Sequence, residues 1–551
     1  MAEDNRAQQI IRDWQHCDSE AANTMNLYQQ VADHFFLREN QITQKTTPGE
    51  DKSLPIIDPT GMHALQKMAA GLSAVIFPSG QYFCRLTPDD MRLVDDEESI
   101  TYLNRVTEKL HLEMFKPACN FNLQINESIY SWCGLGTCNI FSGWDKEKLI
   151  LKYKDWDVAN YRFGVDANDI PNRCMIRWEY TARQAYDLFG ESAGPKIAAC
   201  VKDERNPQEE YKKFWFIYRV QQNYGRNAAL SDNQNYKFIE EIVNESEKII
   251  VQKNGYHEFP FHIARWLVGS QEIWGRGQGT YALSADKELQ HLAKALNLCV
   301  DLHNNPPREV LSSFEGPPRV HPGAYNVAME PNSIRALDPM LNGNFPISEK
   351  MLQMKQEQIR DYFYVKVFAP LDNLPGDRRT TVEIIERVKA GYMQLVLPVT
   401  RFYNECLTPL VERSVMLLLR NFRIPAPPAQ LRGFKVEYLG RLALALQEQQ
   451  ADALQRFSQF GVNMNAVFPN FMVDTLNPDR AGRRMATVFG VNESDLNTDE
   501  EKAAIRQKRA ADEQQMKMMM AAEAGSKAIK NTSQKPEEGS PAEQLLAGVG
   551  G

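Results

Sequence analysis

The 551-residue sequence lacks long apolar runs and regularly spaced cysteines. It has no stretch of about eighteen consecutive apolar residues and no apolar segment behind a basic start, so we expect neither a membrane-spanning nor a secreted chain. The nine cysteines are odd in number and scattered along the sequence. This distribution favours reduced, mostly buried thiols made in a cytosol over a disulfide framework.

An excess of basic residues is also missing, because 63 Lys and Arg stand against 71 Asp and Glu and leave a net charge of −8. Proteins that grip nucleic acid through a globally basic surface draw most of their affinity from neutralised phosphates, so the charge balance argues against such a protein. The hydrophobic content of 43% suffices for packed structure, and the length exceeds a single ordinary core. We therefore expect several domains or an elongated subunit.

Local catalytic signatures are missing as well, including a Walker lysine, HExxH, GxSxG and CxxC. Gly134–Thr137 lacks the rest of a phosphate loop, and we interpret it as a tight turn into the strand Cys138–Phe141. Gly275–Thr280 has no βαβ repeat around it, and we interpret it as a hinge. His257 and His262 have no supporting Cys or acidic ligands. We therefore expect no metal and no cofactor, and we do not expect an enzyme.

The clearest pattern that is present is a pair of helical segments joined by a loop. Apolar residues on one face predict a helix over 348–369. Two prolines and Gly376 predict a loop over 370–379. Thr380 and Glu383 then form a capping box, which predicts the start of a second helix. The apolar residues of the first helix are Leu352, Ile359, Phe363 and Val367.

The second helical segment is long and carries a continuous apolar seam at alternating steps of three and four residues. Pro398 and Pro409 lie inside it, and each removes a backbone donor and crowds the preceding turn. We therefore expect a kinked helix. The seam residues are Ile385, Val388, Tyr392, Leu395, Val399, Phe402, Cys406 and Leu410.

The remaining sequence predicts a mixed α+β fold that is predominantly helical. Alternating, β-rich runs recur between about 138 and 268. A helical stripe from Ser284 ends at Asn304, and the proline-rich stretch after it favours short strands and turns. Helical patterns resume from about 441, and Asp495–Ala524 reads as a charged helix whose methionines favour an exposed or packed helix over a promiscuous binding groove.

Several stretches together resemble the head-to-tail connector, or portal, proteins of short-tailed bacteriophages similar to phage T7. The stretch Gly61–Leu86 shares this resemblance, which is strongest over 380–440. A mildly acidic chain suits a conduit through which DNA slides better than a repressor that holds it. The segments with the most specific resemblance are Thr380–Arg387 (TTVEIIER), Leu397–Val399 (LPV), Leu407–Arg413 (LTPLVER) and Pro425–Pro428 (PAPP).

The resemblance implies a portal fold with an α/β wing, a two-helix stem, a small clip, a long kinked helix and a helical crown. On this sequence the implied parts are 1–275 (wing), 276–305 (first stem helix), 306–347 (clip), 348–369 (second stem helix), 370–379 (channel loop), 380–440 (kinked helix and return to the wing), 441–524 (crown) and 525–551 (flexible tail).

The resemblance also implies a non-enzymatic ring of about twelve subunits at one capsid vertex, through which double-stranded DNA is packaged and ejected. Implied partners are the terminase motor, a tail adaptor, and the major capsid and scaffolding proteins. Such a ring assembles in the host cytoplasm and ends in the virion at the head–tail junction. The alternative is another structural ring of that junction, such as the tail adaptor itself.

Arg378 and Arg379, at the end of the predicted channel loop, are the first candidates for DNA contact. Two adjacent guanidinium groups are often only a solvated capping feature, but ring symmetry would repeat them as a basic collar around phosphates. Such contacts carry no sequence information. Weaker candidates, which could instead pair with acidic residues of a neighbouring subunit, are Lys355, Arg360, Lys287 and Lys294.

Overall fold

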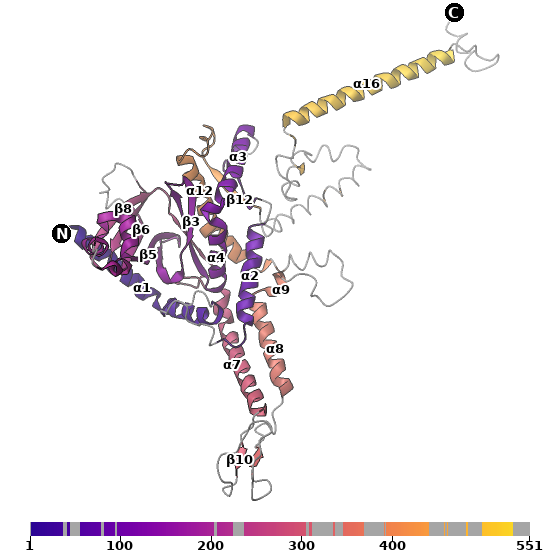
Figure 1. The fold of residues 1–551 in the computed structure, drawn as a ribbon. Coiled ribbons are helices and arrows are strands. Elements are labelled where there is room, and N and C mark those ends of the chain that lie inside the picture. Colours follow the sequence, from indigo (N-terminus) through magenta and orange to yellow (C-terminus); the bar gives the residue numbers. More distant parts are fainter. Residues whose placement is uncertain are drawn as a thin grey trace, which may run out of the picture. The chain divides into compact units, whose positions relative to one another are not determined.

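The computed structural model (Figure 1) divides the chain into two units, Met1–Leu446 and Gln447–Gly551. It describes residues 2–36, 41–44, 56–78, 82–93, 96–202, 206–223, 236–304, 308–310, 334–336, 345–368, 391, 393–439, 457, 460, 481–482, 497 and 499–532. The mixed, largely helical class expected from the sequence is confirmed.

Two helices of the first unit begin beside an aspartate that accepts a backbone hydrogen bond. Asp58 accepts a hydrogen bond from the backbone N–H of Thr60 (2.8 Å) at the start of α2, and Asp96 caps α3 through the N–H of Ser99 (3.1 Å). The helices of this unit are α1 (Ala2–Phe35), α2 (Thr60–Ile76), η1 (Met91–Leu93), α3 (Glu97–Met114), η2 (Pro117–Cys119), α4 (Phe121–Gly134), η3 (Val158–Asn160), α5 (Ala182–Phe189), η4 (Gly190–Ala193), α6 (Pro195–Lys202), η5 (Pro207–Tyr211), α7 (Gln278–Asn304), α8 (Phe345–Tyr362), α9 (Val365–Phe368), α11 (Val396–Phe402), η7 (Tyr403–Leu407) and α12 (Thr408–Arg420).

The strands in the described ranges form four antiparallel sheets. One has the order β4-β5-β6-β7-β8, a second β3-β2-β9, and two are pairs, β1-β12 and β10-β11. Pairing of Cys84 with Tyr438 in β1-β12 joins the strand that follows α12 to a strand near the beginning of the chain. The strands are β1 (Cys84–Pro88), β2 (Thr137–Asp145), β3 (Ile150–Asp155), β4 (Tyr161–Val165), β5 (Pro171–Thr181), β6 (Lys213–Gln222), β7 (Phe238–Asn244), β8 (Ile249–Tyr256), β9 (Phe261–Arg265), β10 (Arg308–Val310), β11 (Ile334–Ala336) and β12 (Phe434–Tyr438).

Helix α1 contributes to two hydrophobic cores. Its first half buries Ile10 and Trp14 against Met175 and Ile217 of the five-stranded sheet. Its second half joins the main core, which also contains the stripes of α2, α3 and α4 and the described seam residues from Leu395 to Leu410. One long amphipathic helix therefore joins the five-stranded sheet to the helical body.

Helices α7 and α8 lie side by side, and β10 lies beyond their ends (Figure 1). The predicted helix over 348–369 is not continuous, because α8 ends at Tyr362 and Tyr364 adopts a positive φ of 51° before α9. The apolar periodicity of the sequence continues across this break and gives no sign of it. The buried Phe363 packs against Phe35 of α1 and the partly buried Phe368 packs against Gly71 of α2, and these contacts turn the chain back onto both helices and explain the interruption.

The seam after Leu395 belongs to a helical rod of three parts, α11, η7 and α12. The middle part, η7, is a π-helical turn, and Pro409 lies in the first turn of α12 directly after it. A helix kinked by Pro398 and Pro409 was predicted. Pro398 lies in the first turn of α11, and the π turn directly before Pro409 shifts the hydrogen-bond ladder by one residue. The channel loop at 370–379 and the capping box at Thr380 lie outside the described residues.

In the second unit the structure describes α16 (Asp499–Thr532). The predicted charged helix is therefore present, and it continues past Gly525, where a flexible tail was expected to begin. Its methionines at 516 and 518–520 are exposed. The predicted crown spans 441–524, and most of its first part, residues 441–498, lies outside the described residues.

Candidate functional site

The α7–α8 pair is held at its root by a polar network. The Gln290 side chain of α7 accepts hydrogen bonds from the backbone N–H groups of Ile57 (2.8 Å) and Asp58 (3.0 Å) and donates one to the Asp58 carbonyl (2.8 Å). Gln356 of α8 donates to the Asp58 carboxylate (2.6 Å). Burial alone would raise the pKa of Asp58, but hydrogen bonds to its carboxylate from Thr60 and Gln356, together with the charge of Arg360, outweigh burial and lower that pKa. The segment before α2 therefore joins both helices.

A second buried contact fixes α7 to α1. Asp286 is 1% exposed and its carboxylate accepts a hydrogen bond from His34 Nδ1 (2.8 Å). Gly61 lies so close that a Cβ there would be 2.8 Å from Asp286 Oδ1. Helices α1, α2 and α7 therefore contact one another where the α7–α8 pair begins.

The four described candidates for DNA contact occupy this helix pair. Lys355 forms an ion pair with Glu288 of α7, so its charge is already engaged within the subunit. Lys287 donates to Gln30 (2.7 Å), Arg360 lies 3.5 Å from Glu357, and Lys294 is exposed. The structure therefore brings them onto two adjacent helices but does not gather them into one basic patch. Arg378 and Arg379 lie outside the described residues.

The sequence did not predict a buried ion pair that fixes the position of the helical rod formed by α11, η7 and α12. Glu405, in the π turn, contacts Arg265 of β9 through the Arg265 backbone N–H (2.9 Å) and guanidinium (2.8 Å). The Arg265 side chain is 4% exposed and also donates to the Asp169 carbonyl (2.8 Å), and Arg401 lies 3.3 Å from Glu405. The sequence signal for this ion pair was Glu405, an acidic residue directly before the apolar seam residue Cys406.

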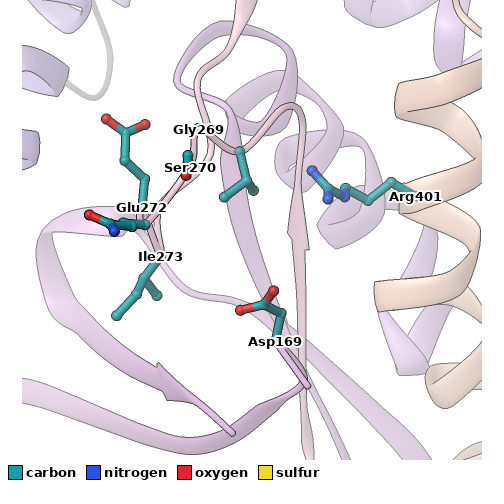
Figure 2. Close-up of a pocket in the computed structure, with 8 residues that line it drawn as sticks. Asp169, Gly269, Ser270, Glu272, Ile273 and Arg401 are labelled. Atoms are coloured by element: carbon teal, nitrogen blue, oxygen red, sulfur yellow. The ribbon is translucent and has the colours of Figure 1, made fainter. Parts of the chain in front are cut away.

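A cavity of about 410 Å³ lies beside this ion pair. Figure 2 shows Arg401 extending from α11 toward the loop that carries Gly269 and Ser270, with Asp169 below it. Two of the three charged lining side chains are engaged, because Arg401 pairs with Glu405 and Glu272 pairs with Arg276. The lining is Asp169, Val268, Gly269, Ser270, Gln271, Glu272, Ile273 and Arg401.

The two glycine segments pack against each other, which gives them a different role from a phosphate loop or a hinge. Gly277 donates to the Leu135 carbonyl (3.0 Å), and Trp266 donates to that of Gly136 (2.8 Å). A Cβ on Gly277 would lie 2.5 Å from the carbonyl oxygen of Gly134. Glycine is required here because two backbones approach closely.

Buried titratable groups in the described regions are structural. Burial raises the pKa of the Cys133 and Cys138 thiols, which keeps them protonated and unreactive. Burial, reinforced by the charge of Arg413, holds the pKa of His262 well below its usual value, and its ring contacts Ser142 (2.7 Å). Across the described ranges, no group of three His, Cys, Asp or Glu side chains is placed to hold a metal ion. No described helix is both long and apolar enough to cross a membrane.

Comparison with known proteins gives full-length similarities. Residues 7–496 match the family described as bacteriophage head to tail connecting protein. A probable portal protein of Bordetella phage BPP-1 is 24% identical over 530 residues, which cover 94% of this chain and 93% of that protein. The portal protein of Salmonella phage epsilon15 is 22% identical over 514 residues, which cover 90% and 89% of the two chains.

Proposed function

Because the chain belongs to the family of bacteriophage head-to-tail connecting proteins, we propose that it is the portal subunit through which double-stranded DNA enters and leaves a phage head. The single observation that carries this function is the family match over nearly the whole chain. The family is structural, so no catalytic role is assigned. The family match does not favour the tail-adaptor alternative.

The working assembly is a closed ring of about twelve copies in which each subunit uses two different faces. The α7–α8 pair supports this proposal, because it forms a two-helix layer whose root is fixed to the body by Gln290 and Asp286. We assign α7 and α8 as the stem and the segment 306–347, which includes the β10–β11 pair, as the clip. A stem of this kind would line the DNA channel.

DNA contact in this assembly is sequence-independent and weak. Lys287 and Lys294 on α7 are the described cations best placed for it, since Lys355 and Arg360 have acidic neighbours. Arg378 and Arg379 of the channel loop remain the principal proposed contacts. The chain's net charge of −8 favours sliding over retention.

The proposed partners follow from the position of each part at the capsid vertex. The clip would receive the tail adaptor, and the ring would support the terminase motor during packaging. Capsid and scaffolding proteins would surround the wing. We place the assembled ring in the virion at the head–tail junction, after assembly in the host cytoplasm.

Electron microscopy of the purified full-length chain, with its mass measured by sedimentation, tests this function. We expect a hollow ring whose mass is a multiple of 63.0 kDa. A compact monomer, particularly one that binds labelled ATP, would overturn the proposal.

A further inference from the structure

An exposed phenylalanine occupies a position that favours glycine. Helix α12 ends in a Schellman motif, in which the N–H of Arg423 donates to the Leu418 carbonyl (2.9 Å) and that of Phe422 to the Leu419 carbonyl (3.1 Å). This geometry puts Phe422 at a φ of 55°, where a side chain crowds the backbone. The Phe422 side chain is nevertheless 94% exposed. Neither local conformation nor burial among the residues that the structure describes explains a large aromatic group there.

A second apolar residue shows the same combination beside it. Leu149 closes the β2–β3 turn at a φ of 54° and is 50% exposed. The β7–β8 turn is closed in the same way by Lys248, at a φ of 57°, whose ammonium group water can solvate. Arg423 donates to the Leu149 carbonyl (3.0 Å), so the two turns are neighbours. We call this pair the Leu149–Phe422 surface.

Positive charge predominates around the Leu149–Phe422 surface. Lys146, Lys148, Arg420 and Arg423 are all exposed there, against one exposed carboxylate in the same β2–β3 turn, that of Glu147. The nearby carboxylates are partly engaged, because Glu258 pairs with Arg420 and with the buried Arg413 (3.2 Å), and Asp145 accepts from the backbone N–H groups of the turn (2.9 and 3.1 Å). The chain as a whole carries a net charge of −8, so a locally basic surface is electrostatically complementary to the acidic remainder of an identical chain.

We propose that the Leu149–Phe422 surface is a subunit contact, in which Phe422 inserts into an acidic-rimmed apolar site on a second copy of this chain. Exposed aromatic residues flanked by arginine are the side chains that contribute most to protein interfaces. A contact between two different surfaces of identical subunits is also the kind that generates a ring. This inference rests on the proposed portal function and specifies which residues hold its subunits together.

Replacement of Phe422 by glycine separates assembly from folding, because glycine suits the backbone conformation and removes only an exposed side chain. For Phe422→Gly and Leu149→Gly we expect the thermal unfolding temperature of the dissociated subunit to stay equal or rise. We expect the ring to dissociate at a protein concentration at least about tenfold higher than the parent ring in a sedimentation dilution series. Leu188→Ala, which truncates a 60% exposed leucine on α5, is the matched control and should leave dissociation unchanged.

The alternatives give distinct results. If the parent forms rings and both glycine variants dissociate as it does, the proposed contact is overturned while the portal function stands. Unchanged rings with weaker binding of duplex DNA, or of vesicles containing anionic lipid, would assign the surface to nucleic acid or to a membrane and also overturn the proposal. A parent chain that forms no ring at any concentration would instead overturn the proposed function itself.

Discussion

The buried contact between Glu405 and Arg265 gives a quantitative prediction. Glu405→Ala leaves the Arg265 guanidinium, whose side chain is only 4% exposed, without its carboxylate partner. Breaking a buried pair from one side typically costs about 3–5 kcal/mol, because the remaining charge stays desolvated. Unit 1 spans Met1–Leu446, so an unfolding entropy of about 2.1 cal/mol/K per residue gives roughly 0.9 kcal/mol/K. The melting temperature should therefore fall by about 3–5 °C.

Differential scanning calorimetry of the full chain measures this change, with Asp187→Ala as the control. Asp187 pairs with Arg183 on the surface of α5, where both side chains are more than half exposed, and its loss should change stability by less than about 1 kcal/mol. Glu405→Gln keeps an acceptor for the Arg265 backbone N–H and should fall between the two. Equal melting temperatures for Glu405→Ala and Asp187→Ala would refute the argument that this pair fixes the rod.

Three further predictions concern the channel loop, pH and backbone packing. Arg378→Ala combined with Arg379→Ala should leave ring mass unchanged but reduce DNA retention at low salt for any sequence; retention equal to the parent's would assign both residues to capping. Below pH about 6.5 the unfolded chain protonates His262 while the native chain does not, so the free energy of unfolding should decrease as the pH falls. His262→Gln should flatten this slope when unfolding is measured from pH 7 to 5, and parallel slopes for parent and variant would contradict the argument. Gly277→Ala should lower the free energy of unfolding by about 2–4 kcal/mol in denaturant unfolding, because the added Cβ would clash with backbone atoms. Gly433→Ala is the control, because a Cβ there would lie 3.8 Å from its nearest neighbour, and similar losses for both variants would argue against the close backbone approach.

Much of the fold could be predicted because local pattern and tertiary burial agree. The described seam residues Leu395, Val399, Phe402, Cys406 and Leu410 are buried, and the β-rich runs between about 138 and 268 contain β3, β6 and β9. The break at Tyr364 could not be predicted in the same way, because the apolar period continues across it. Only the distant contacts of Phe363 with Phe35 and of Phe368 with Gly71 select the interrupted form.

The candidate site was harder to predict because its polar contacts join residues far apart in sequence. Gln290 and Asp58 are separated by more than two hundred residues, and neither has a local motif. The cations on α7 and α8 were visible in the sequence, but the ion pair of Lys355 with Glu288 depends on how the helices pack. The exposed Phe422 drew no attention because its importance lies in a backbone angle that sequence composition does not reveal.

The contacts of the helical rod formed by α11, η7 and α12 restrict where the chain can bend. Three polar contacts fix its later part: Glu405 to Arg265, Arg413 to the Ser142 carbonyl (3.2 Å), and Thr408 to Tyr438 (2.7 Å). All three follow Phe402, so the π turn is held in place and does not act as a free hinge. A shift of the rod would require the buried Arg265 guanidinium to lose its carboxylate partner, so any displacement of the preceding chain has to be absorbed before Leu395, where the buried seam begins among the described residues.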